Sequence, residues 1–279
     1  MRFTKMHGAG NDYIYVNCFE ETVREPAALA VRMSRQHYGV GADGLVLIEP
    51  SPVADFGMRI FNADGSESEM CGNATRCIAK YVYERGLTSK TTLTLMTGSG
   101  LRELKLNVRG GRVHTVRVDM GTPELSPRAI PVDIPGELIV NYPLKTGDLA
   151  WHVTCVSMGN PHCVIFVNEP YDVDLPMVGP LLEHLPIFPH RANIEFVSVR
   201  QRDEITMRVW ERGSGETLAC GTGACAALVA SVLTGKANRD ARVHLPGGDV
   251  LVSWSPEDNH VYQEGDASFV FDGEWPDEV

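Results

Sequence analysis

The feature that most constrains the fold of this chain is a short pattern that occurs twice at one fixed spacing. Residues 58–61 (Met-Arg-Ile-Phe) return as residues 207–210 (Met-Arg-Val-Trp), and the pair Cys71-Gly72 returns as Cys220-Gly221. The spacing is 149 residues in both cases (207 − 58 and 220 − 71). The same spacing relates Gly10-Asn11 to Gly159-Asn160, Glu67 to Glu216, and Gly86 to Gly235. Chance matches would not keep one spacing, so the sequence indicates a duplicated domain.

The size and composition of the chain fit this interpretation. With 279 residues, of which 43% are hydrophobic, the chain can form two ordinary domains that each bury a core. Apolar runs stay well below the roughly 20 residues that span a bilayer. The first residues lack the apolar stretch of a signal peptide, so we expect a cytoplasmic protein without membrane contact. A net charge of −11 argues against a nucleic-acid partner, whose phosphates require a basic surface.

The cysteines indicate reduced thiols rather than disulfides or a metal site. Their number is seven, which is odd, and they form no Cys-x-x-Cys motif. The intervals from Cys71 to Cys77 and from Cys220 to Cys225 are too long for a zinc knuckle, and no histidine follows at ligand spacing. We therefore expect no metal.

Runs rich in Val, Ile, Thr and aromatic residues predict a sheet in each half. The predicted strands are 2–6, 13–18, 45–48, 58–62, 91–97, 101–108 and 112–120, then 150–157, 163–167, 193–199, 205–211, 242–245 and 250–254. Helices are predicted at 26–36, 71–84, 176–184 and 220–233. The last of these helices is so apolar that other structure must surround it. The helix at 71–84 carries Arg76, Lys80 and Glu84 four residues apart, which predicts a solvent-facing stripe. The proline-rich stretch 122–143 suits the crossover between the halves.

The two Cys-Gly pairs predict a site for proton transfer at carbon. A cysteine at the first turn of a helix meets unpaired backbone N–H groups and the positive end of the helix dipole, which stabilise a thiolate. The same N–H groups can hold a carboxylate. Two copies facing each other would place a thiol on each side of one ligand. A thiolate and a thiol on opposite faces of one carbon invert a stereocentre, since one removes a proton and the other delivers one. No cofactor is then required.

Several longer motifs resemble the diaminopimelate epimerase family over nearly the whole chain. They are Met-His-Gly-Ala-Gly-Asn-Asp at 6–12, Gly-Ala-Asp-Gly at 41–44, Phe-Asn-Ala-Asp-Gly-Ser-Glu at 61–67 running on to Met-Cys-Gly-Asn at 70–73, Gly-Asn-Pro-His at 159–162, Ala-Asn-Ile at 192–194, and 210–213 through 219–223. The resemblance implies an α+β fold of two homologous duplicated domains, each a β-barrel-like sheet around a central helix, with the active site in the cleft between them. The implied domains are 1–119 with a C-terminal strand at about 266–279, and 120–265.

The resemblance also implies roles for individual residues. Cys71 and Cys220 are the expected acid and base, with His162 and Glu211 near the reacting centre. The expected cradle of the reacting carboxylate is Gly72, Asn73, Gly221 and Thr222. The distal amino-acid end of the substrate would be held by Asn11, Asn62, Asn160, Asn193, Glu211 and Arg212. An arginine can bind a carboxylate with two hydrogen bonds, and asparagine offers both a donor and an acceptor.

The family's activity is the cofactor-independent epimerisation of LL-2,6-diaminopimelate to meso-diaminopimelate in lysine and peptidoglycan precursor biosynthesis. The implied partners are a small amino-acid substrate and a second copy of the chain in a homodimer. The chain departs from the family at Gly44, where some members carry a glutamine, and at Ala74-Thr75, where a glycine-containing pair is more usual.

Two alternatives remain open from the residues. One is a racemase or epimerase of another amino acid, of the proline, hydroxyproline or histidine type, on the same fold. Arg212 separates this alternative from a diaminopimelate epimerase, because only a substrate with a distal carboxylate requires an arginine there. The other is a redox-responsive binding protein in which Cys71 and Cys220 form a reversible disulfide.

Overall fold

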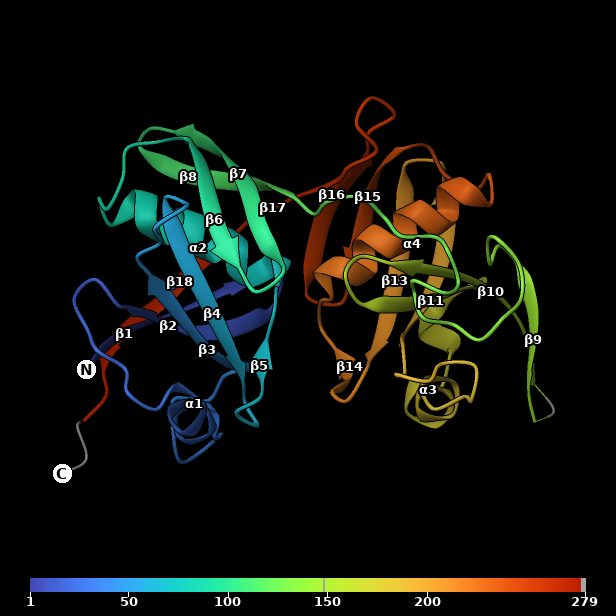
Figure 1. Ribbon diagram of the computed structural model, residues 1–279, viewed down its shortest axis with the longest axis horizontal. Coiled ribbons are helices and arrows are strands. Elements are labelled where there is room, and N and C mark those ends of the chain that lie inside the picture. The colour runs from blue at the N-terminus through green and yellow to red at the C-terminus, as the bar shows by residue number, and fades with distance from the viewer. Residues whose placement is uncertain (148, 277–279) are drawn as a thin grey trace. The chain divides into compact units, whose positions relative to one another are not determined.

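The computed structural model describes residues 1–147 and 149–276, which fall into two compact units (Figure 1). Unit 1 contains Met1–Asp119 and the C-terminal segment from Glu264, and unit 2 contains Met120–Gln263. The end of the expected C-terminal strand, residues 277–279, lies outside the described residues. No helix in the described ranges is long and apolar enough to cross a membrane.

Unit 1 is built on one sheet in which parallel and antiparallel neighbours are mixed. Its strands are β1 (Arg2–Gly8), β2 (Asn11–Asn17), β3 (Gly44–Glu49), β4 (Phe56–Asn62), β5 (Glu67–Ser68), β6 (Thr92–Thr97), β7 (Gly100–Arg109), β8 (Arg112–Asp119) and β18 (Ser268–Glu274). From one edge the order is β18, β1, β2, β3, β4, β6, β7, β8, with β5 paired to β4. The pairs β2–β3 and β4–β6 are parallel and the other pairs are antiparallel.

Unit 2 repeats this plan. Its strands are β9 (Tyr142–Thr146), β10 (Leu149–Ser157), β11 (Pro161–Phe166), β12 (Asn193–Gln201), β13 (Glu204–Glu211), β14 (Gly215–Thr217), β15 (Asp240–Leu245) and β16 (Gly248–Trp254), and β17 (Val261–Gly265) crosses the boundary between the units. The parallel pairs are now β11–β12 and β13–β15. Tyr13 lies opposite Gly44 in unit 1, and His162 lies opposite Asn193 in unit 2, so even the strand register keeps the spacing of 149.

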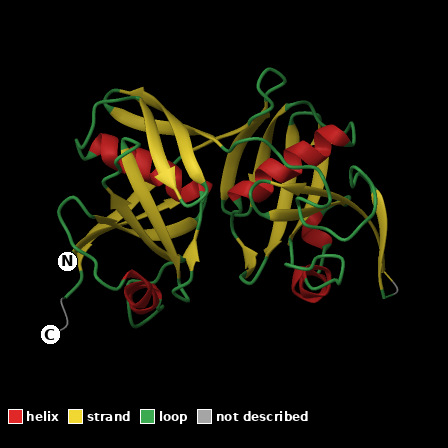
Figure 2. Ribbon diagram, viewed as in Figure 1, coloured by secondary structure: helices red, strands yellow, loops and turns green. Residues whose placement is uncertain are grey.

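Each sheet wraps around one helix, as Figure 2 shows. Helix α2 (Gly72–Glu84) contacts β1, β2, β7 and β8, and helix α4 (Gly221–Leu233) contacts β10, β11, β12, β13, β15 and β16. The predicted enclosure of α4 is confirmed, because its residues from Gly223 to Ser231 are all buried. The expected fold class, α+β with a sheet around a central helix in each duplicated unit, is likewise confirmed.

The predicted solvent-facing stripe on α2 is wrong. Arg76 is 0% exposed, and Lys80 and Glu84 are largely covered. Lys80 bonds to Glu84 at 2.7 Å and donates to the Val113 carbonyl, while Glu84 accepts the Val113 N–H. These polar groups join α2 to β8, so hydrogen bonding compensates for their removal from water.

Two further helices cover the outer faces of the sheets. Helix α1 (Pro26–Ser34) packs on β3 and β4, and α3 (Leu175–Glu183) packs on β12, β13 and β14, with the short 3₁₀ helix η1 (Pro170–Asp172) beside it. Strand β9 was not predicted, because it starts inside the proline-rich stretch assigned to the crossover. Pro143 is tolerated there because β9 pairs with β10 at an edge of the unit 2 sheet.

Candidate active site

In unit 1 the candidate site forms where α2 begins. Cys71 has an extended backbone and is the N-cap of α2, and its carbonyl oxygen accepts the Thr75 N–H at 2.9 Å. The Sγ atom of Cys71 lies 3.3 Å from the Oδ1 atom of Asn11, at the start of β2. The helix therefore starts at the thiol, and Gly72 and Asn73 supply its first backbone N–H groups.

The Asn11 side chain is fixed by its neighbours. Its amide nitrogen donates to Asp43 Oδ2 at 2.7 Å, and its oxygen accepts from the Asn73 amide at 3.2 Å. This orientation leaves the Asn11 oxygen facing Cys71, so the thiol has an acceptor for its proton. Asn62 ends β4 at the same edge of the sheet, but its described hydrogen bond is a local one to the Ser66 hydroxyl at 3.0 Å.

In unit 2 the equivalent thiol is more enclosed. Cys220 is the N-cap of α4 and is buried, and its sulfur accepts the Gly223 N–H at 3.4 Å. The Thr222 hydroxyl lies 3.6 Å from the same sulfur. The pKa of the Cys220 thiol is raised well above its usual value, first by burial and then by the carboxyl groups of Glu211 and Glu195. This differs from the expectation that the helix N-terminus would favour the thiolate, because burial and negative charge outweigh that effect at Cys220.

Glu211 lies beside Cys220 at the end of β13. Its carboxyl group accepts a hydrogen bond from the Thr217 hydroxyl. Burial raises the pKa of Glu211, against the opposing effects of Thr217 and of His162. A carboxyl group of this kind can hold a proton more readily than one in water.

His162 on β11 lies between the predicted residue Asn160 and Glu195, which the sequence interpretation missed. Its Nδ1 lies 2.6 Å from Glu195 Oε1, and its Nε2 lies 3.0 Å from Asn160 Oδ1. Glu195 is 0% exposed, and its second oxygen has no hydrogen-bond partner among the described atoms. A charged residue inside the apolar run Asn-Ile-Glu-Phe-Val was the signal that could have identified Glu195.

Asn193 and Arg212 belong to the same group of side chains. The backbone N–H of Arg212 donates to Asn193 Oδ1 at 2.8 Å, and the Asn193 side-chain amide donates to the Pro161 carbonyl at 3.3 Å. The Arg212 guanidinium donates to the His190 carbonyl at 3.1 Å. The predicted residues of unit 2 therefore meet at the start of α4 and the adjacent ends of β11, β12 and β13. Among the described residues, no three His, Cys, Asp or Glu side chains are arranged to hold a metal ion.

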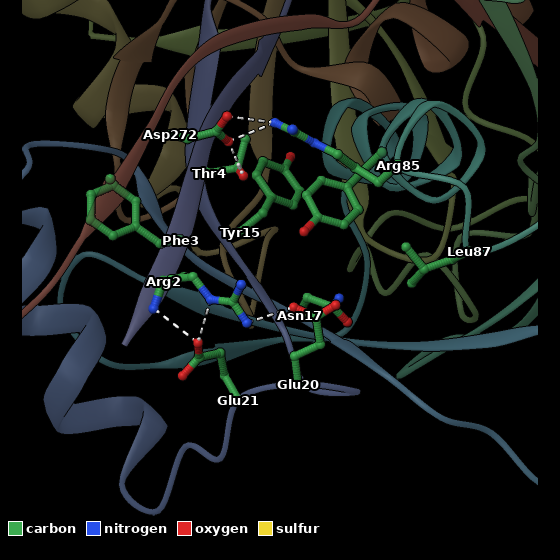
Figure 3. Close-up of a pocket in the computed structure, with 12 residues that line it drawn as sticks. Arg2, Phe3, Thr4, Tyr15, Asn17, Glu20, Glu21, Arg85, Leu87 and Asp272 are labelled. Atoms are coloured by element: carbon green, nitrogen blue, oxygen red, sulfur yellow. Dashed lines mark hydrogen bonds and ion pairs between the residues drawn. The ribbon is translucent and has the colours of Figure 1, made fainter.

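A cavity of about 460 Å³ lies elsewhere, in unit 1 near the C-terminal end of α2 (Figure 3). None of the predicted site residues lines it. The charges in it pair with one another: Arg2 binds Glu20 and Glu21, and Arg85 Nη2 binds both Asp272 oxygens at 2.6 and 2.8 Å. The charged side chains Arg2, Glu20, Glu21, Arg85 and Asp272 of this cavity are thus paired with one another, and the start of each central helix remains the candidate site.

Comparison with known proteins decides the family. The diaminopimelate epimerase family profile matches residues 3–126 and 154–270. The chain belongs to the diaminopimelate epimerase family. It is 56% identical to the diaminopimelate epimerase of Acetivibrio thermocellus over 98% of each chain, and 54% identical to that of Pelotomaculum thermopropionicum over 99% of each. A member of this family is an isomerase.

Solved structures with lower identity share the fold. A phenazine biosynthesis protein of the PhzF family from Bacillus anthracis superposes with a TM-score of 0.72 at 18% identity, covering 99% of each chain. A hydroxyproline epimerase from Agrobacterium vitis gives the same TM-score at 14% identity, covering 98% of this chain and 91% of its own. These likenesses extend the duplicated fold beyond diaminopimelate epimerases.

Proposed function

We propose that this chain converts LL-2,6-diaminopimelate to meso-diaminopimelate, with Cys71 and Cys220 as the acid and base. The observation that carries the proposal is that both thiols are N-caps of equivalent helices at the spacing of 149, within a chain of this family. The reaction is a step of lysine and peptidoglycan precursor biosynthesis.

The chemistry consists of two proton transfers at one carbon. One cysteine, as thiolate, takes the α-hydrogen, so that a C–H bond breaks, an S–H bond forms and the electron pair stays on the substrate. The other cysteine, as thiol, then delivers a proton to the opposite face and becomes the thiolate. In this scheme the backbone N–H groups of Gly72, Asn73, Gly221 and Thr222 bind the α-carboxylate and stabilise the carbanion. No cofactor takes part.

Polar residues of both units bind the two-ended substrate in this proposal. Asn11, Asn62, Asn160, Asn193, Glu211 and Arg212 hold the distal amino and carboxyl groups, and His162 lies near the reacting centre. Two hydrogen bonds support this assignment, one from the Arg212 backbone N–H to Asn193 and one between His162 and Asn160, because they hold the two asparagine side chains in fixed orientations.

Proton exchange in deuterated water tests the proposal. The reduced wild type and the variants Cys71→Ala and Cys220→Ala are incubated with LL-diaminopimelate, and loss of the α-hydrogen and the isomer ratio are followed by NMR. We expect inversion with deuterium incorporation in the wild type and a loss of inversion by about 10³-fold or more in each variant. A folded wild type that exchanges no α-hydrogen overturns the proposal.

Arg212→Ala separates diaminopimelate from amino acids without a distal carboxylate. We expect this variant to lose most of its affinity for diaminopimelate, since the guanidinium is the group that can bind a carboxylate with two hydrogen bonds. Activity of the wild type on proline or hydroxyproline, unchanged in Arg212→Ala, would instead favour a racemase of that type.

A cytoplasmic homodimer completes the proposal. Both reacting thiols must stay reduced, which suits a reducing compartment. Light scattering of the purified protein measures the oligomeric state, and a mass of one chain would remove the homodimer from the proposal. Cell fractionation measures the location.

A further inference from the structure

Glu183 is a buried carboxyl group that the proposed chemistry does not use. It ends α3 and is 3% exposed, and both of its oxygens accept hydrogen bonds. Oε1 accepts the Arg191 guanidinium at 3.2 Å and the Gly213 backbone N–H at 3.0 Å. Oε2 accepts the Trp210 indole N–H at 2.8 Å. Removing a carboxylate from water is costly, and these three donors compensate for it while they join α3 to two other segments of unit 2.

One of these segments carries Arg212. Arg212 lies between Trp210 and Gly213, in the turn that follows the end of β13 at Glu211. The pairing of β13 with β14 still holds Trp210 and Glu211, but Arg212 and Gly213 lie beyond it. The contact between the Gly213 N–H and Glu183 therefore replaces the support that the sheet no longer gives to Arg212.

The side chain of Arg212 reaches the other segment. Its guanidinium donates to the His190 carbonyl at 3.1 Å, and the next residue is Arg191, the ion-pair partner of Glu183. Arg191 has a φ of 58°, in the left-handed region that non-glycine residues rarely adopt. This angle sets the direction of the peptide group that carries the His190 carbonyl, so the ion pair helps to hold that carbonyl towards Arg212. Arg212 itself is exposed, which leaves its guanidinium accessible to a ligand.

Close packing of α3 against Trp210 brings Glu183 to this position. A Cβ atom added at Gly179 would lie 2.5 Å from the Trp210 ring, so the ring lies against the backbone of the helix. Gly179 and Glu183 are four residues apart and therefore share one face of α3. The indole N–H and the carboxylate meet as a result of this packing.

The equivalent place in unit 1 lacks the arrangement. Helix α1 begins 149 residues before α3 (175 − 26), and Ser34 occupies the position of Glu183 (183 − 34). The Ser34 hydroxyl is buried and has no hydrogen-bond partner among the described atoms. The positions of Arg191, Trp210 and Gly213 hold Ala42, Phe61 and Asp64. Helix α1 still packs on its sheet, so the duplicated fold does not require the carboxylate, which is present in the unit that contains Arg212.

We propose that Glu183 is a positioning residue that determines specificity, because through Arg191 and Gly213 it holds Arg212 in the orientation that binds a distal carboxylate. The proposal rests on the proposed function, which assigns that carboxylate to Arg212. An arginine forms two hydrogen bonds to a carboxylate only when its planar guanidinium is correctly oriented. Fixing the backbone of Arg212 and the carbonyl acceptor of its side chain before the substrate arrives lowers the entropy lost on binding.

Steady-state kinetics of Glu183→Gln test the proposal. A glutamine side chain has one acceptor oxygen and a donor nitrogen, so it cannot accept all three N–H groups. We expect KM for LL-diaminopimelate to rise about tenfold and kcat to fall less than about threefold, because Glu211 remains bound to Gly215 and Thr217. Ser34→Ala, the counterpart in unit 1, is the matched control and should change neither. A folded Glu183→Gln with the wild-type KM overturns the proposal.

A double-mutant cycle separates positioning from a general structural role. Arg212→Lys keeps a charge for the substrate but has no planar guanidinium to orient. In that background Glu183→Gln should lower kcat/KM by less than about twofold, because the two substitutions remove the same interaction. Effects on kcat/KM that simply multiply would show that Glu183 only stabilises unit 2, and would overturn the proposal.

A second variant covers the case in which Glu183→Gln does not fold. Arg191→Gln removes the other partner of the ion pair, and its side chain is 49% exposed, so the substitution leaves the core of unit 2 in place. We expect it to raise KM about threefold with little change in kcat. A folded Arg191→Gln with the wild-type KM is then the refuting result.

Amide hydrogen exchange at Gly213, followed by NMR, needs no substrate and keeps this proposal separate from the proposed function. We expect the Gly213 N–H to exchange at least about tenfold faster in Glu183→Gln than in the wild type, and an unchanged rate contradicts the hold of Glu183 on the turn. A wild type that inverts no diaminopimelate contradicts the proposed function, and faster exchange in the variant still supports the hold on the turn. A wild type that inverts diaminopimelate, with an unchanged KM in Glu183→Gln, contradicts the role of Glu183 alone.

Discussion

The sulfur of Cys71 and the side-chain oxygen of Asn11 are 3.3 Å apart, although 60 residues separate them in the sequence. The same Asn11 oxygen accepts the Asn73 amide, and the Asn11 nitrogen is bound to Asp43. Asn11 thus orients the thiol, in addition to the substrate contact proposed for it. Its mutation is expected to affect the chemical step as well as binding.

Asn11→Ala should lower kcat by about 10- to 100-fold, because a misplaced base loses much of its efficiency. Asn62→Ala is the matched control, since the described hydrogen bond of Asn62 is a local one to Ser66. We expect Asn62→Ala to raise KM more than it lowers kcat. Steady-state kinetics of both variants measures the difference. Equal effects of the two substitutions on kcat would show that Asn11 does not orient Cys71.

The duplicated positions Ala74 and Gly223 offer a second comparison. A Cβ atom at Gly223 would lie 2.9 Å from Glu195 Oε1 and 3.2 Å from the Cys220 sulfur, so Gly223→Ala must displace one of these groups. We expect Gly223→Ala to lower kcat/KM by about 10-fold or more. Ala74→Gly, its counterpart, should cost about 1 kcal/mol of stability and change kcat/KM little. Thermal melting and kinetics of both variants test this, and a fully active Gly223→Ala would argue against a close approach of Glu195 to the thiol.

We expect the buried carboxyl group of Glu211 to lower the stability of the protein near neutral pH while it serves activity. Its pKa is raised in the folded protein, chiefly by burial, so the folded state binds a proton more tightly than the unfolded state. The free energy of unfolding therefore falls as the pH rises from the usual value of 4.5 through the raised pKa. Glu211→Gln should remove this loss and melt at a higher temperature than the wild type at pH 7, but not at pH 4. Its kcat should fall by about 10²-fold or more. A lower melting temperature at pH 7 would contradict the argument.

The repeat let the sequence predict most of the framework. The two Cys-Gly pairs fall where α2 and α4 begin, because a helix start is a local property of a few residues. The polar stripe on α2 was wrong, since Arg76, Lys80 and Glu84 find their partners on β8 and at Asp266, residues distant in the sequence. A helical period alone does not say whether a polar face meets water or other polar groups.

The electrostatics of the site were least predictable. The prediction of a favoured thiolate considered only the helix N-terminus. It left out the effect on Cys220 of the predicted Glu211 on β13, and it missed Glu195 on β12. Glu195 is 25 residues before Cys220 (220 − 195) and reaches it only through the pairing of strands. Charges that meet through tertiary structure require the fold before their effect on a thiol can be judged.

An ion pair that occurs in both units tests how burial changes the contribution of an ion pair to the free energy of unfolding. Arg59 binds Glu67 at 2.7 Å and Arg208 binds Glu216 at 2.8 Å, at the spacing of 149. The Arg59 side chain is 43% exposed and that of Arg208 12% exposed, and Arg208 also donates to the Pro170 and Val173 carbonyls at 2.9 Å. We expect Arg208→Ala to cost about 2 kcal/mol of unfolding free energy and Arg59→Ala less than about 1 kcal/mol. Chemical denaturation measures both, and equal losses would contradict the role of the carbonyl contacts.

We expect His244 to stabilise unit 2 by an amount that depends on pH. His244 lies on β15 and links this strand to both of its neighbours. Its Nδ1 lies 2.8 Å from Asp249 on β16, and its Nε2 is hydrogen-bonded to Glu204 on β13. Burial lowers the pKa of His244, but the hydrogen bonds to Glu204 and Asp249 outweigh it, so the net pKa is raised above 6.5. A raised pKa means that the stabilisation is complete below pH 6.5 and is lost as the pH rises through the folded-state pKa.

His244→Gln should therefore melt at a lower temperature than the wild type at pH 5.5, by about 2 to 4 °C, with the difference shrinking towards pH 9. Because the side chain is 38% exposed, added salt should also reduce the difference at pH 5.5. A difference in melting temperature that grows with pH would show that the charged form of His244 does not stabilise the sheet.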